Sequence, residues 1–137
     1  MRDHESALQK AMLARLKADP ALDALLAGRV FDQAPEGAET PNLVVGRCES
    51  RPVAAADCGV EQRLTLTVVS RFAGMEEAKA VAAAVRACLE AAALEADGVR
   101  TATLRTVFSD VSRAGDGRRT YAVVRLRAVT EETGEDE

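Results

Sequence analysis

The stretch from residue 62 to residue 94 constrains the fold most, because it carries two hydrophobic periods in succession. From Gln62 to Ser70, apolar and polar side chains alternate, which is typical of a β-strand with one face in a core. From about residue 75 to 94, apolar side chains recur every three or four positions, which predicts an amphipathic helix. The chain must therefore combine a sheet with a helix that packs on it. The apolar stripe of this helix consists of Ala78, Val81, Ala82, Val85, Leu89 and Ala92.

Similar patterns divide the rest of the chain. A first helix is predicted over residues 4–18, and Asp19-Pro20 ends it because proline disfavours helical backbone in the residue before it. A short helical turn follows and ends at Gly28. Strands are predicted at 29–32, 42–48, 99–112 and 120–130, and loops at 33–41, 50–59 and 113–119. Hairpin connections dominate this order, so we expect an α+β fold: a mostly antiparallel four- to five-stranded sheet with two main helices packed on one face.

The alternation also predicts which side chains enter the core. In the strand at 120–130, the inward positions are Ala122, Val124, Leu126 and Ala128. The outward positions are Tyr121, Val123, Arg125 and Arg127. In the strand at 99–112, one face should hold Ala102, Leu104, Thr106 and Phe108. His4, at the start of the first helix, is expected to be exposed.

Length and composition favour one domain. The chain has 137 residues, an ordinary size for a single domain. We expect the domain to span residues 1–130, followed by a flexible acidic tail at 131–137, where Glu and Asp predominate. No apolar run approaches ~18 residues, so no membrane span is expected. The charged N-terminal segment predicts no secretory signal.

The sequence contains no recognisable pattern for catalysis or for cofactor or metal binding. Its one His has no partner motif, and its three cysteines include no C-x-x-C pair. Gly115-Asp116-Gly117 lies between two predicted strands, which is typical of a hairpin rather than a phosphate-binding turn. The net charge of −4 argues against a nucleic-acid surface that depends on overall positive charge. We therefore expect no enzyme, no cofactor and no metal site.

Arginines gather on the final hairpin. One interpretation is a solvated sheet face. A second is a protein interface, because Arg and Tyr are favoured anchors in interfaces and an acidic partner patch would complement them. An RNA-binding sheet is less well supported, because the expected aromatic stacking pair is missing. The candidate interface residues are Arg113, Arg118, Arg119, Tyr121, Arg125 and Arg127.

Several segments together resemble the phage tail-terminator family, also called tail-completion or head-to-tail joining proteins, which occurs in phages, prophages and gene transfer agents. The resemblance covers about residues 5–130. It is carried by Gly28-Arg29-Val30-Phe31-Asp32, Ala34-Pro35, Pro41-Asn42-Leu43-Val44-Val45-Gly46, Leu66-Thr67-Val68-Val69-Ser70-Arg71, Gly74, the helix start Glu77-Ala78, the alanine-rich helix through Leu89, and the closing strand from Asp116-Gly117 to Arg127.

This resemblance implies a structural role. Family members form a ring, commonly of six subunits, that caps the head-proximal end of the tail tube, stops its polymerisation and receives the head connector. The implied partners are further copies of the chain, the major tail tube protein and the connector, with DNA only as cargo through the ring channel. The implied location is the tail of a phage-like particle assembled in the bacterial cytoplasm. Two alternatives remain: an adaptor or stopper of the connector, and a small enzyme or ligand-binding domain whose site forms at a subunit interface.

Overall fold

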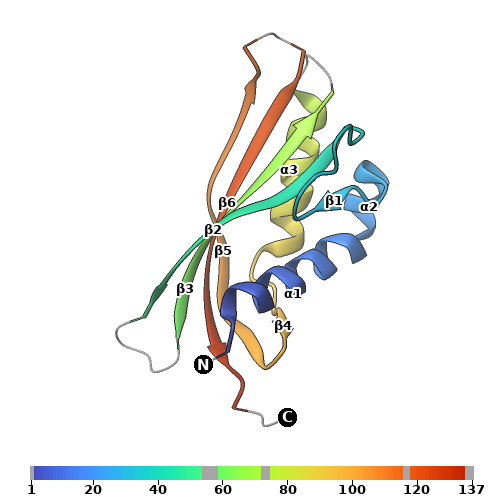
Figure 1. The fold of residues 1–137 in the computed structure, drawn as a ribbon. Coiled ribbons are helices and arrows are strands. Elements are labelled where there is room, and N and C mark those ends of the chain that lie inside the picture. The colour runs from blue at the N-terminus through green and yellow to red at the C-terminus, as the bar shows by residue number, and fades with distance from the viewer. Residues whose placement is uncertain (1, 54–58, 72–74, 116–117, 135–137) are drawn as a thin grey trace.

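The computed structural model describes residues 2–53, 59–71, 75–115 and 118–134. Within these residues, three helices and six strands follow one another (Figure 1). In order they are α1 (His4–Ala18), α2 (Pro20–Leu26), β1 (Val30–Phe31), β2 (Asn42–Pro52), β3 (Val60–Ser70), α3 (Glu76–Leu89), β4 (Glu95–Ala96), β5 (Val99–Arg113) and β6 (Thr120–Glu132).

The strands form one sheet in the order β1-β2-β3-β6-β5-β4. β1 runs parallel to β2, and the other neighbours are antiparallel. Figure 1 shows the helices on one side of this sheet and no described helix or strand on the other side. The predicted α+β class is confirmed. The prediction was wrong in detail: the sheet has six strands and is mixed, and α2 is a helix in its own right.

Local capping explains where the helices begin and end. Asp3 caps α1, since its Oδ1 accepts a hydrogen bond from Ser6 N at 3.0 Å. Asp19 ends α1 and at the same time caps α2, because its Oδ2 accepts from Leu22 N at 3.0 Å. The two helices therefore meet at a corner with no residue other than Asp19 between them. Leu8, Met12, Leu16, Leu22 and Leu26 are thereby buried in the core.

Helix α3 buries the apolar stripe that its sequence predicted, and it contacts β3, β5 and β6. It ends at Leu89, five positions before the expected end at about residue 94. Ala91 takes a positive φ of 54°, and its N–H donates to the carbonyl of Leu104 at 3.0 Å. The chain after α3 therefore joins the sheet edge as β4 instead of continuing as helix.

Two segments, one predicted to be a loop and the other a flexible tail, are partly strand. β2 continues to Pro52, paired with β3 as far as Pro52 opposite Val60, so the expected loop at 50–59 was wrong for residues 50–52. β6 continues through Glu132, which pairs with Val99, so the expected tail was wrong at its first two residues. In both cases pairing with a neighbouring strand outweighs weak local strand propensity. Residues 54–58 and 135–137 lie outside the described chain.

The prediction that Ala102, Leu104, Thr106 and Phe108 share one face of β5 was wrong. Leu104 is buried and Thr106 is half-buried, but Ala102 is exposed and Phe108 retains 48% of its accessible surface. The register with β6 shifts between Thr101 and Thr103 and again between Thr106 and Phe108. Each β-bulge inserts one residue and reverses the inside–outside alternation that follows it.

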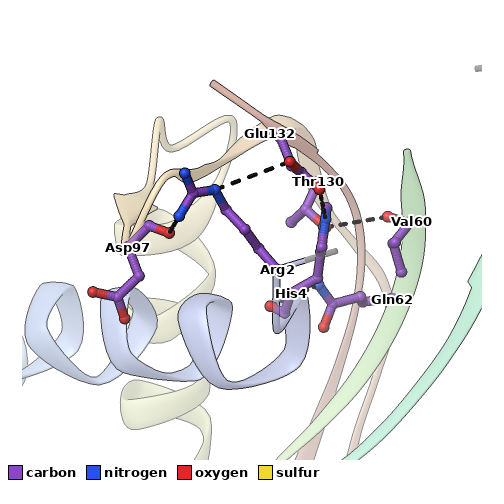
Figure 2. A network of polar contacts seen from close by, with 7 residues as sticks. All are labelled: Arg2, His4, Val60, Gln62, Asp97, Thr130 and Glu132. Atoms are coloured by element: carbon purple, nitrogen blue, oxygen red, sulfur yellow. Dashed lines mark hydrogen bonds and ion pairs between the residues drawn. The ribbon is translucent and has the colours of Figure 1, made fainter. Parts of the chain in front are cut away.

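The expectation that His4 is exposed was wrong, since it retains only 3% of its accessible surface. Figure 2 shows it between the ends of β3 and β6. Its Nδ1 lies 2.8 Å from Oγ1 of Thr130, and Gln62 Nε2 donates both to the His4 carbonyl at 3.2 Å and to the same Oγ1 at 3.0 Å. Because β6 extends past Thr130, it covers the start of α1. His4 therefore joins α1 to the sheet.

Candidate protein interface

The uncovered face of the sheet carries the outward side chains of β6. The predicted alternation of this strand is confirmed: Ala122, Val124, Leu126 and Ala128 are fully buried, and Tyr121, Val123, Arg125 and Arg127 occupy the opposite face. The register places Arg63 of β3 on one side of Arg127 and Arg105 of β5 on the other. Side chains directly opposite in an antiparallel pair lie about 4.5–5.5 Å apart at Cβ. Three arginines thus form a row across three strands.

A single carboxylate compensates part of this charge. Oε2 of Glu61 lies 2.6 Å from Nε of Arg127, and its Oε1 lies 3.5 Å from Nε of Arg51 and 3.6 Å from Nε of Arg63. The hydrogen bond from Arg127, together with the neighbouring guanidinium charges, holds the pKa of Glu61 below its usual value. Glu61 is therefore ionised at neutral pH and is shared among three arginines, so the cluster keeps a net positive charge.

Beside this row the outer face has an apolar patch and a hollow. The guanidinium carbon of Arg125 lies 5.2 Å from the ring centroid of Phe108, within the range of a cation–π contact. Val107 and Phe108 both sit at the second β5 bulge and expose nearly half of their surface. A hollow of about 220 Å³ opens next to them, lined by Arg47, Glu49, Arg63, Leu64, Thr65, Val107, Arg125 and Leu126. Arginines thus line the hollow, and exposed Phe108 lies against one of them; Arg and aromatic side chains are enriched at protein interfaces.

The other predicted arginines lie at the far end of the hairpin. Arg113 ends β5, and the N–H of Ala114 donates to the carbonyl of Arg119 at 2.8 Å. Arg113, Arg118 and Arg119 are all exposed. Arg119 and Arg127 are eight positions apart along extended chain, roughly 26 Å at about 3.3 Å per residue. The predicted cluster is therefore two groups, with Tyr121 half-buried between them.

The sequence prediction missed the arginines contributed by other strands. Arg63 lies in the alternating stretch from Gln62 to Ser70, where its outward position could have been read from the period of two. Arg105 stands between Leu104 and Thr106, so the same alternation could have placed it on the outward face. That Arg63 and Arg105 flank Arg127 depends on strand register, which the sequence does not reveal.

The rest of the described chain has few side chains placed for catalysis or metal binding. No group of three or more His, Cys, Asp or Glu among the described residues is placed to hold a metal ion. Burial raises the pKa of the Cys48 and Cys88 thiols, which keeps them protonated and weakly nucleophilic. Cys58 lies outside the described residues. A cavity of about 430 Å³ lies between the start of α1 and the paired ends of β2 and β3, where Pro52 is opposite Val60. No described helix is both long enough and apolar enough to span a bilayer.

Comparison with known proteins identifies the family. Residues 10–131 match the family described as tail completion protein gp17. A chain in the solved structure "Virion of native gene transfer agent (GTA) particle" shares the fold with a TM-score of 0.83 and 27% sequence identity, covering 96% of this chain and 99% of that chain. No curated protein matches the chain significantly. The chain belongs to the tail completion protein gp17 family, as its sequence resemblance predicted. It is a structural tail protein and not an enzyme.

Proposed function

We propose that this chain is a tail terminator: a closed ring, most simply a hexamer, that caps the head-proximal end of a tail tube and receives the head connector. The family match over residues 10–131 carries the proposal. The likeness to a chain of a gene transfer agent virion supports a place in a phage-like particle, assembled in the bacterial cytoplasm. The partners are then further copies of this chain, the major tail tube protein and the connector, and DNA passes through the ring channel as cargo.

The mechanism is physical rather than chemical. When each subunit binds the next through the same head-to-tail contact, and the rotations between neighbours add up to a full turn, the subunits form a closed ring. A closed ring has no free end from which to grow. One rim of the ring would cover the last tube subunits, and the other would present a surface to the connector. The open, arginine-bearing sheet face and hairpin, with Arg113, Arg118, Arg119, Tyr121, Arg125 and Arg127, supply contact surface for such an assembly.

The test is tail length in particles produced without this chain. A terminator limits the tube, so its removal should give tubes that are abnormally long or variable in length and not joined to heads. The measurement is the length distribution in electron micrographs, with the chain restored from a plasmid as the control. Unjoined tails of normal, uniform length would contradict the proposal and favour an adaptor or stopper of the connector.

A further inference from the structure

Two surfaces at opposite edges of the sheet have complementary charge. At one edge the loop between β1 and β2 carries Asp32, Glu36 and Glu39 and no Lys or Arg. At the other edge the β5–β6 hairpin carries exposed Arg105, Arg113 and Arg119. We call residues 32–41 the acidic loop and these three arginines the arginine edge. β2, β3 and β6 separate β1 from β5 in the sheet, and no ion pair joins the two surfaces within the described chain.

We propose that the acidic loop of one copy docks on the arginine edge of the next copy, and that this contact joins neighbouring subunits of the ring. The proposal rests on the proposed function, since it names the contact that closes the terminator ring. A head-to-tail interface needs two different surfaces on one subunit, each complementary to the other. The two edges of this sheet meet that requirement.

The charges of the arginine edge have no ion-pair partner among the residues that the structure describes. Arg105, Arg113 and Arg119 form no ion pair with any residue that the structure describes, whereas Arg51, Arg63 and Arg127 share Glu61. Arg105 also lies directly opposite Arg127 in the register, which is unfavourable for two like charges. A carboxylate from outside the subunit would relieve this repulsion.

Two of the three acidic-loop carboxylates are uncompensated, and the loop is held in place at its base. Among the described residues, Asp32 and Glu36 form no ion pair, whereas Glu39, whose side chain is 85% exposed, forms an ion pair with Arg29 at 3.8 Å. Nδ2 of Asn42 donates to the Glu39 carbonyl at 3.0 Å, and Nε of Arg29 donates to the Pro41 carbonyl at 2.8 Å. An anchored loop loses less conformational entropy on docking.

The backbone and apolar surface of β5 also favour a contact. β4 pairs only with Val99 and Arg100, and beyond the Leu104 carbonyl no described strand covers the outer edge of β5 up to Arg113. An uncovered strand edge presents unpaired backbone groups, which a neighbouring chain can satisfy. Val107 and Phe108 add exposed apolar surface beside this edge.

A charge swap tests the contact. We expect the same effect from either of two double variants, Arg105→Glu/Arg113→Glu or Asp32→Arg/Glu36→Arg. Each brings like charges together at the contact, so the protein concentration for half-maximal ring formation should rise at least about tenfold. Combining the four substitutions restores opposite charges and should restore rings. Native mass spectrometry and electron microscopy of the purified chain at high concentration, and the amount of chain on purified tails, are the measurements. Each variant should melt close to the unsubstituted chain, because all four side chains that are changed are exposed.

Lys17→Glu/Lys79→Glu is the matched control. It changes the net charge as much as Arg105→Glu/Arg113→Glu, but on exposed faces of α1 and α3, and it should leave ring formation unchanged. The docking proposal is wrong if the unsubstituted chain forms rings and either charge-reversed double variant also forms rings. It is also wrong if the combined variant fails to form rings. Neither result contradicts the terminator ring itself. If the unsubstituted chain is a dimer both in solution and on tails, the ring itself is wrong.

Discussion

Val85→Asp should leave the subunit unfolded. Val85 lies at the centre of the α3 stripe, has no accessible surface and packs in the core between α3 and the sheet. Aspartate at this position would bury a carboxylate without a partner, at a cost of several kcal/mol, and would lose the packing of the Val side chain. A domain of this size has a total stability of about 5–15 kcal/mol, so the substitution removes much or all of it.

The measurement is a circular-dichroism melting curve. Val85→Asp should show little or no cooperative transition, whereas Ala83→Asp, on the exposed face of the same helix, should melt within a few degrees of the unsubstituted chain. This control separates burial of the carboxylate from its effect on helix propensity. A cooperative transition of Val85→Asp near that of Ala83→Asp would contradict the buried position of the stripe.

Arg118→Glu/Arg125→Glu should impair particle assembly while the fold stays intact. Arg118 is exposed on the hairpin, and Arg125 is exposed on the open sheet face over Phe108. Surface substitutions usually change stability by about 0.5 kcal/mol, and loss of an exposed cation–π contact adds about 0.5–1 kcal/mol. If this face and hairpin form an interface, reversing both charges replaces attraction for an acidic partner with repulsion.

The expected result is a near-normal melting curve together with abnormal tail length and a lower infectious or transducing titre. Lys17→Glu/Lys79→Glu controls again for the change in net charge. If the double variant has normal melting, tail length and titre, the arginines of the open face are only a solvated surface. The contacts would then lie elsewhere on the subunit.

The parts of the fold that depend on local periodicity could be predicted from the sequence. The stripe of α3 and the two faces of β6 follow from side-chain spacing alone, and Asp19-Pro20 marks the α1–α2 corner because its effect is local. The bulges of β5 could not be predicted, because they arise from its pairing with β6. The burial of His4 also depends on contacts with residues more than fifty positions away, Gln62 and Thr130.

The candidate interface was predictable only in part for the same reason. Arg125 and Arg127 are outward by the alternation of their own strand, and the tip arginines are exposed because they lie at a turn. The row that Arg127 forms with Arg63 and Arg105 requires the order and register of three strands. Likewise, the separation of the acidic loop from the arginine edge is a property of the sheet order, which no local pattern encodes.

The position of this chain in intact particles tests the central claim most directly. Electron cryomicroscopy of purified, tailed particles should resolve density that fits this fold as a closed ring between the last ring of the tail tube and the head connector. An open central channel along the tail axis is expected. Density for the chain at the distal tip of the tail, inside the connector, or as a dimer on the tail surface would contradict the account.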